Sequence, residues 1–162
     1  MAIAFGLGSN MGDRLGYLRE AAGRLESVFG LCLRRGDVFE TEPWGGVTQP
    51  FYLNACVCFD AETNIQPLEL LRIVKDMERE MGRVESVRWG PRVIDIDILL
   101  MDDIVFQSPE LQIPHASMHL REFVLTPLGQ ILPEWKHPVT GLGISEMKKL
   151  LPASSIFRVV RL

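Results

Sequence analysis

The sequence lacks the long apolar runs, the excess of basic residues and the cysteine pairs that mark several large classes of protein. No apolar run reaches the roughly 20 residues that a helix needs to cross a bilayer, and the first residues carry no basic region of a signal peptide. The formal net charge is −4, which argues against a broad basic surface for nucleic acid. None of the three cysteines has a partner at zinc spacing, so we expect small buried thiols in a reducing cytoplasm.

Familiar nucleotide-binding and hydrolytic motifs are missing as well. The chain has no Gly-x4-Gly-Lys-Ser/Thr segment, so any ATP site is not a P-loop. Gly6-x-Gly8 is not followed by the third glycine of a dinucleotide fingerprint. Neither a His-Glu-x-x-His segment nor a nucleophile elbow occurs. Any nucleotide site must therefore rest on other residues.

Length and periodicity predict one α+β domain. The 162 residues are 47% hydrophobic and 23% charged, which is typical of one globular domain with a buried core. Strands are predicted at 2–7, 31–41 with an interruption at Gly36, 51–60, 93–100 and 156–160. Helices are predicted at 13–29, 67–81, 121–131 with a break near Pro127, and 144–150. This order predicts a ferredoxin-like, split-βαβ antiparallel sheet with helices packed on it.

The segment with the most chemical information is 88–99, Arg-Trp-Gly-Pro-Arg-Val-Ile-Asp-Ile-Asp-Ile-Leu. In a strand, Asp95 and Asp97 point to one face and the isoleucines between them to the other. The two carboxylates repel each other when both are ionised, and a strand this apolar is expected to be central, where water screens poorly. Carboxylates completed by phosphate oxygens and water are ligands that Mg²⁺ favours. A solvent-exposed strand face is the other interpretation of the Asp-x-Asp pair.

Basic residues surround this acidic pair. Four arginines lie just before it: Arg79, Arg83, Arg88 and Arg92. Arginines beside paired carboxylates are expected where a polyphosphate binds, because a metal bridges its oxygens from one side and guanidinium groups grip them from the other. For Arg79, a surface ion pair with Glu80 or Glu85 is the better interpretation. His115 and Arg121 offer further donors to phosphate.

A third group of residues combines aromatic surface with polar groups. Trp44 follows Thr41 and Pro43 in a glycine-rich segment, and an exposed tryptophan there is unusual unless it covers something. Strand alternation places Tyr52 and Asn54 on one face. This combination suits a flat heteroaromatic ring with donors and acceptors at its edge. An equally good interpretation is that Trp44 and Tyr52 close one end of the core.

With these residues the chain resembles the 6-hydroxymethyl-7,8-dihydropterin pyrophosphokinases over nearly its whole length. The matching segments are Gly8-Ser9-Asn10-x-Gly12-Asp13-Arg14, Thr41-Glu42-Pro43-Trp44-Gly45, Gln49-Pro50, Tyr52-Leu53-Asn54-Ala55, Glu78, Gly82-Arg83, Arg88-Trp89-Gly90-Pro91-Arg92-x-x-Asp95-Ile96-Asp97-Ile98-Leu99, Pro114-His115, Arg121-x-Phe123-Val124-Leu125 and Pro127-Leu128. The 88–99 segment is highly specific, and the others follow in the expected order. Glu85, Val87 and Ala116 depart from the family pattern near the nucleotide.

The resemblance implies a reaction and a set of residues. Such an enzyme transfers diphosphate from ATP to the hydroxymethyl oxygen of the pterin, releases AMP and uses two Mg²⁺ ions. The implied catalytic residues are Arg83, Arg92, Asp95 and Asp97, and the two aspartates are the implied metal ligands. The implied ATP-binding residues are Glu78, Arg83, Trp89, Arg92, Ile98, His115 and Arg121. The implied pterin-binding residues are Thr41, Pro43, Trp44, Tyr52, Asn54 and Phe123. Segments 42–50 and 84–91 are expected to close over the substrates.

We further expect residues 1–162 to form a single catalytic domain, acting as a cytoplasmic monomer on these small molecules without nucleic acid or membrane. Two other functions are weighed against this one. A Mg²⁺-dependent nucleotidyl or phosphoryl transferase with another acceptor would not need the pterin-side residues. A non-catalytic binding domain, which ferredoxin-like sheets often form, has no need of the paired carboxylates Asp95 and Asp97.

Overall fold

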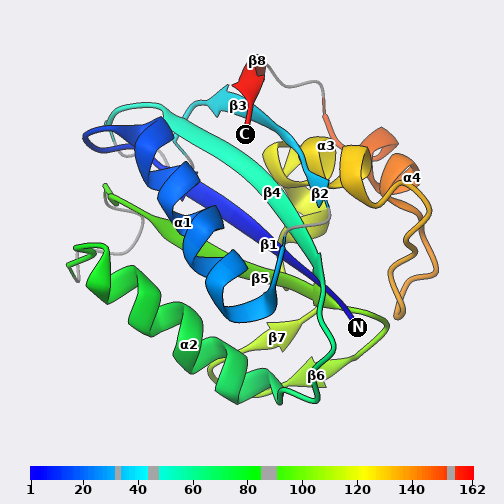
Figure 1. The fold of residues 1–162 in the computed structure, drawn as a ribbon. Coiled ribbons are helices and arrows are strands. Elements are labelled where there is room, and N and C mark those ends of the chain that lie inside the picture. Colours follow the sequence, from blue (N-terminus) through cyan, green and yellow to red (C-terminus); the bar gives the residue numbers. More distant parts are fainter. Residues whose placement is uncertain (32–33, 44–47, 85–90, 153–155) are drawn as a thin grey trace.

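Helices cover both faces of a six-stranded antiparallel sheet (Figure 1). The computed structural model describes residues 1–31, 34–43, 48–84, 91–152 and 156–162. Its strands are β1 (Ala2–Ser9), β2 (Arg34–Arg35), β3 (Asp37–Thr41), β4 (Tyr52–Asp60), β5 (Asp95–Met101), β6 (Phe106–Gln107), β7 (Gln112–Ile113) and β8 (Phe157–Arg161). Its helices are α1 (Arg14–Phe29), α2 (Pro67–Glu80), the 3-10 helix η1 (Met118–Leu120), α3 (Glu122–Ile131) and α4 (Ile144–Lys149).

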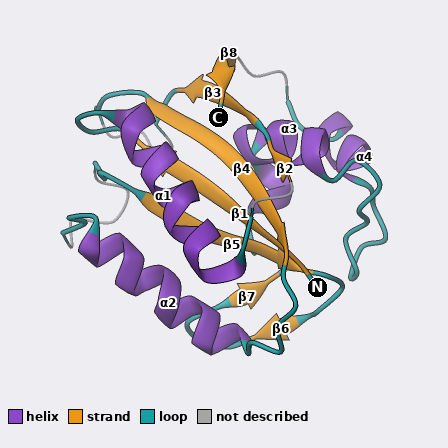
Figure 2. Ribbon diagram, in the orientation of Figure 1, coloured by secondary structure: helices purple, strands orange, loops and turns teal. Residues whose placement is uncertain are grey.

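The strand order confirms the predicted α+β architecture. The sheet runs β5-β1-β4-β3-β8, with β2 also paired to β4, and each of these pairs is antiparallel. Strand β4 lies between β1, which precedes α1 in the chain, and β3, which follows it after the short β2, and this is the split-βαβ arrangement. Helices α1 and α2 cover one face, and α3 and α4 lie on the other (Figure 2).

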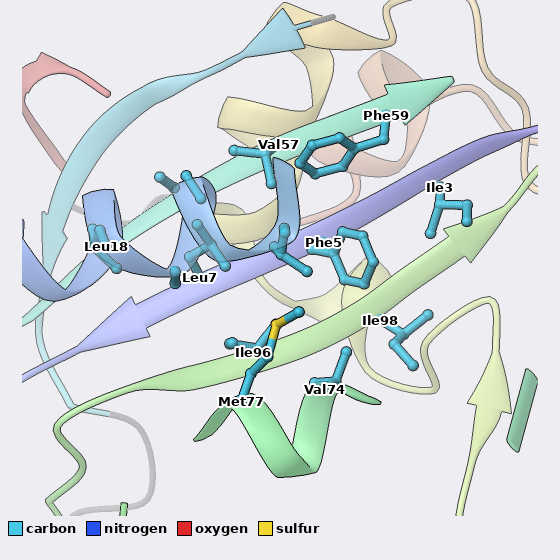
Figure 3. Packing of buried hydrophobic residues seen from close by; sticks show 14 of the residues in the cluster. Ile3, Phe5, Leu7, Leu18, Val57, Phe59, Val74, Met77, Ile96 and Ile98 are labelled. Atoms are coloured by element: carbon cyan, nitrogen blue, oxygen red, sulfur yellow. The ribbon is translucent and has the colours of Figure 1, made fainter. Parts of the chain in front are cut away.

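The main core lies between the sheet and helices α1 and α2. Alternation in β4 sends Val57 and Phe59 into this core, where the Phe59 ring meets Phe5 of β1 edge-on at 6.0 Å between centroids. Figure 3 shows Ile96 and Ile98 of β5 entering the same core beside α2. Leu53 and Ala55 share this inward face, whereas Phe51 precedes the strand and is 43% exposed.

The second face of the sheet is buried too, which argues against a fully solvent-exposed strand face at the Asp-x-Asp pair. Cys56 and Cys58 of β4 pack with Leu99 and with Leu125 and Leu128 of α3. Both cysteines are buried, as expected for small apolar residues of a core. The strand that carries Asp95 and Asp97 is therefore not a strand with one fully solvated face.

The structure confirms one predicted feature of an individual element and contradicts two others. The predicted interruption at Gly36 is confirmed, and a Cβ there would lie 3.0 Å from the Pro127 carbonyl oxygen of α3. The predicted break at Pro127 is wrong: α3 continues through it, because its buried face holds the helix against the sheet although proline donates no hydrogen bond. The predicted central position of the 93–100 strand is also wrong, since β5 ends the sheet. Among the described residues, no helix is long and apolar enough to span a membrane.

Candidate active site

A cavity of about 170 Å³ opens on the sheet face that carries α3. It lies where the end of β1 meets the starts of β4 and β5. Nine predicted site residues line it: Thr41, Tyr52, Asn54, Arg92, Asp95, Asp97, His115, Arg121 and Phe123. The fold thus brings together, at one place, side chains that come from five separated stretches of the sequence.

Two glycines of β1 form the floor of this cavity, and the sequence analysis missed their role. Gly8 pairs with Asp95 on one side and Asn54 on the other, and Gly6 pairs in the same way with Asp97 and Cys56. A Cβ on Gly8 would lie 3.3 Å from Asn54 Oδ1, so a side chain there would crowd the floor. Glycine at alternate positions of a strand signals such a close approach, and this signal was available in the sequence.

The acidic end of the cavity holds Asp95 and Asp97 between basic side chains. Arg83 Nη1 and Arg92 Nη1 each donate to Asp95 Oδ1 at 2.9 Å. Arg121 Nη1 lies 3.4 Å from Asp97 Oδ2. Burial, and then the charge of Asp95, raise the pKa of Asp97 to about 7. The charge of Arg121 therefore offsets only part of the effect of burial and of Asp95 on the pKa of Asp97.

This donor set fits a hard cation that completes its coordination with oxygen from a ligand. Among the described residues, no group of three or more His, Cys, Asp and Glu side chains is placed to hold a metal ion. Mg²⁺ is typically bound by one or two carboxylates together with water and substrate phosphates. Asp95 and Asp97 meet that requirement, and the raised pKa of Asp97 indicates a place where added positive charge is favourable.

His115 and Arg121 form the wall beside Asp97. Burial, and then the charge of Arg121, lower the pKa of His115 to about 4, so its imidazole is neutral near pH 7. His115 Nδ1 accepts a hydrogen bond from the backbone N–H of Ser117 at 3.2 Å. Nε2 therefore carries the ring hydrogen, and it lies 3.9 Å from Asp97 Oδ2. This neutral N–H can donate to an oxygen bound at the acidic end.

The opposite end of the cavity combines aromatic surface with a fixed amide. Asn54 Nδ2 donates to Thr41 Oγ1 at 2.8 Å, and both side chains are buried. This bond leaves Asn54 Oδ1 on the side of Gly8 at the cavity floor. Burial, and then the charge of Asp95, raise the pKa of Tyr52, which keeps its phenol neutral. The Arg121 guanidinium carbon lies 5.8 Å from the centre of the Phe123 ring.

Apart from Arg83, which contacts Asp95, the other predicted site residues that the structure describes do not line the cavity. The Ile98 side chain is buried in the core beside α2, and Glu78 is buried behind β5 rather than lining the cavity. Pro43 is half-buried and is not a lining residue. Trp44 and Trp89 fall outside the described residues, as do Glu85 and Val87. For Ile98, only backbone atoms remain to contact a ligand on the cavity side.

Asn10 joins the segments that border the cavity, a role that its place in the N-terminal motif did not predict. Its side chain is 1% exposed. Asn10 Nδ2 donates to Gln49 Oε1 at 2.8 Å and to the Pro50 carbonyl at 3.1 Å. Asn10 Oδ1 accepts from the backbone N–H of Arg92 at 2.8 Å. One buried amide thus connects the end of β1 to the segments before β4 and before β5.

Related proteins match most of the chain. The family model described as 7,8-dihydro-6-hydroxymethylpterin-pyrophosphokinase matches residues 4–133. The chain is 39% identical over 146 residues to the 2-amino-4-hydroxy-6-hydroxymethyldihydropteridine pyrophosphokinase of Aquifex aeolicus, covering 90% of this chain and 89% of that protein. It is 40% identical over 150 residues to the folic acid synthesis protein fol1 of Schizosaccharomyces pombe, covering 92% of this chain but only 20% of the longer protein.

A solved structure shares the fold. The crystal structure of Plasmodium falciparum HPPK-DHPS with pteroate matches with a TM-score of 0.71 and 18% identity, covering 91% of this chain and 42% of that one. The fold comparison places the chain beside one part of a longer protein. The sequence comparisons go further, because a family model covers most of the chain and the Aquifex aeolicus protein matches almost end to end. The chain belongs to the 7,8-dihydro-6-hydroxymethylpterin-pyrophosphokinase family.

Proposed function

We propose that this enzyme transfers diphosphate from ATP to the hydroxymethyl group of 6-hydroxymethyl-7,8-dihydropterin, giving AMP and the pterin diphosphate for folate synthesis. The observation that carries the proposal is the arrangement of the cavity floor. Gly6 and Gly8 separate the acidic end, with Asp95 and Asp97, from the amide and aromatic end at Asn54. Family membership, and the name of the Aquifex aeolicus relative, give the reaction class.

The acidic end would hold the reacting phosphates. Asp95 and Asp97 would bind two Mg²⁺ ions, which when bound supply Lewis-acid charge to the phosphate oxygens. The ion pairs at Asp95 mean that Arg83 and Arg92 are already gathered at this place. Guanidinium groups released from Asp95 can grip phosphate oxygens in a bidentate manner and stabilise the charge that develops during transfer.

The nucleotide would extend along the wall from this point. The neutral Nε2–H of His115 and the guanidinium of Arg121 both lie beside Asp97, where they can donate to phosphate. Ile98 would contribute through its backbone, since its side chain lies in the core. The ATP-binding set implied by the family resemblance is Glu78, Arg83, Trp89, Arg92, Ile98, His115 and Arg121, of which Glu78 does not line the cavity.

The pterin would occupy the amide and aromatic end. Asn54 Oδ1 can accept from the donor edge of the ring, because the bond from Asn54 Nδ2 to Thr41 fixes the amide orientation. Tyr52 and Phe123 offer apolar surface to the ring faces. The full proposed set is Thr41, Pro43, Trp44, Tyr52, Asn54 and Phe123. A ring held there points its hydroxymethyl group across the glycine floor toward the phosphates, and catalysis rests on this positioning.

The test is AMP release from ATP and Mg²⁺ in the presence and absence of 6-hydroxymethyl-7,8-dihydropterin. The proposal expects AMP only when the pterin is present, with diphosphorylated pterin formed in equal amount. Formation of ADP would show simple phosphoryl transfer and contradict the reaction. AMP release that is independent of the pterin would point to another acceptor. Pterin binding without turnover would favour the binding-domain alternative.

A further inference from the structure

Glu78 of α2 is a buried carboxylate that touches the strand carrying the acidic pair. Its side chain is 1% exposed, and Oε1 accepts a hydrogen bond from the backbone N–H of Ile96 at 2.7 Å. Ile96 is the residue between Asp95 and Asp97. Because β5 is at the end of the sheet, this N–H faces away from β1 and has no strand partner there among the residues that the structure describes. The Glu78 carboxylate therefore completes the outer edge of β5 at its chemically important residue.

The same carboxylate also orients an arginine of the site. Glu78 Oε1 forms an ion pair with Arg83 Nη1, and that nitrogen donates in turn to Asp95 Oδ1 at 2.9 Å. The second oxygen, Oε2, accepts from Lys75 Nζ at 2.9 Å. Both oxygens of Glu78 are thus engaged inside the protein, and the residue does not line the cavity. One buried charge links the backbone between the aspartates to the guanidinium that contacts Asp95.

We propose that Glu78 is a positioning residue that sets the geometry of the acidic end without contacting the substrates. It fixes the strand between Asp95 and Asp97 through Ile96 and holds Arg83 at the place where the phosphates react. This inference rests on the proposed function, because it assigns the β5 carboxylates to the phosphates. It differs from the nucleotide-contact role implied by the family resemblance, and the two roles have different experimental consequences.

Two substitutions separate the backbone contact from the charge. Glu78→Gln keeps a side-chain oxygen for the Ile96 N–H but removes the charge that holds Arg83. Glu78→Ala removes both. The matched control is Glu80→Gln on the same helix, because Glu80 is exposed and its ion pair is with Arg24, away from β5. Glutamine is nearly isosteric with glutamate, so the Glu78→Gln variant carries the test if the alanine variant does not fold.

The first measurement needs no substrate. Amide hydrogen exchange of the ligand-free protein, followed by NMR, reports the Ile96 N–H directly. We expect exchange at Ile96 to rise by about tenfold or more in Glu78→Ala and to stay near the wild-type rate in Glu78→Gln and Glu80→Gln. Unchanged Ile96 exchange in a folded Glu78→Ala variant would overturn the backbone role, whatever reaction the enzyme catalyses.

The second measurement separates positioning from contact. In Glu78→Gln, single-turnover transfer should slow by about tenfold or more, while ATP and pterin dissociation constants stay within about threefold of wild type. Weaker ATP binding with an unchanged transfer rate would instead identify a substrate contact and overturn the positioning role. Wild-type values throughout would overturn it as well. If wild-type enzyme shows no pterin-dependent AMP release, the proposed function fails, and the exchange result still decides the Ile96 contact.

Discussion

The backbone N–H of Arg92 donates to Asn10 Oδ1 at 2.8 Å, and the backbone N–H of Asn10 donates back to the Arg92 carbonyl at 3.1 Å. This reciprocal pair joins the end of β1 to the segment that leads into β5. The side-chain nitrogen of Asn10, Nδ2, donates hydrogen bonds to Gln49 Oε1 and to the Pro50 carbonyl on the other side. Arg92, which contacts Asp95, is therefore held in place from β1 as well as by its own ion pair.

We expect Asn10→Ala to destabilise the protein by about 1–3 kcal/mol, because it leaves buried polar groups without partners. Asn10→Asp keeps an oxygen for the Arg92 N–H but loses the donor to Gln49 and Pro50. The aspartate variant should therefore bind ATP with an affinity near that of wild type and bind pterin more weakly. Urea unfolding and separate titrations with each substrate check both statements. Equal loss of ATP and pterin affinity in Asn10→Asp would contradict the idea that the Arg92 contact supports the ATP side and the contacts with Gln49 and Pro50 support the pterin side.

Gly8→Ala should weaken pterin binding by about tenfold, which corresponds to roughly 1.4 kcal/mol. The added Cβ would lie 3.3 Å from Asn54 Oδ1 and 3.6 Å from the Tyr52 ring, at the place proposed for the pterin edge. Gly23→Ala in α1 is the control, because a Cβ there meets nothing within 4 Å. That control should stabilise the fold by up to about 1 kcal/mol and leave binding unchanged. Unaltered pterin affinity in Gly8→Ala would place the ring elsewhere.

The metal-free protein should lose stability as the pH rises toward neutrality, because of Asp97. Its pKa in the folded protein is about 7, above the ordinary value of 3.8, so between these pH values the folded chain binds more protons than the unfolded chain. Asp97→Asn should be more stable than wild type above pH 7, by an amount on the order of 1–3 kcal/mol after allowance for solvent screening. Below about pH 4 the difference should vanish.

The measurement is urea unfolding of both proteins in EDTA across this range. His115 also titrates, with a pKa lowered to about 4, so the difference between the two proteins at each pH is the quantity to compare. Adding Mg²⁺ at pH 8 should stabilise the wild type more than the variant, because the cation binds the folded carboxylate. A stability difference that does not vary with pH would show that Asp97 is not perturbed in the folded protein.

Asp97→Ala should abolish pterin-dependent AMP formation while the fold remains intact. Asp97 lines the cavity beside Asp95, and its loss removes half of the proposed metal ligands. Asp76→Ala on the exposed face of α2 serves as the control and should keep wild-type activity. Turnover is followed by AMP release and folding by circular dichroism. Near-normal turnover in Asp97→Ala would make the metal assignment wrong.

Much of this arrangement could be predicted because it depends on local periodicity. Strand alternation correctly placed Tyr52 and Asn54 of β4 on one face, and the two-residue spacing placed Asp95 and Asp97 together in one cavity. Both are consequences of strand geometry that need no knowledge of neighbouring elements. The interruption at Gly36 was also predicted from a local signal, because glycine often marks a change of backbone conformation along the chain.

What could not be predicted depends on contacts between distant parts of the chain. The apolar character of β5 indicated burial, but this burial does not come from a central place in the sheet. It comes from α2 and from the segment around His115, where the backbone N–H of His115 donates to the Leu99 carbonyl at 2.9 Å. The bond from Ile96 to Glu78 likewise joins residues on different elements. Periodicity assigns a residue to a face but does not identify the partner on that face.

Cys56 lines the cavity, and yet its thiol should be chemically inert. Its side chain is 1% exposed, and Sγ lies 3.6 Å from the Val124 carbonyl, to which it donates. Burial, and then the charge of Asp97, raise the pKa of the thiol well above its usual range, and the thiol form is a poor nucleophile. Iodoacetamide at pH 8 should therefore leave Cys56 unmodified in the native protein and modify it fully in urea, as peptide mass spectrometry can show. Modification of native Cys56 at the rate of a free cysteine would mean that the floor of the cavity opens to solvent, and the packing of β4 against α3 would need revision.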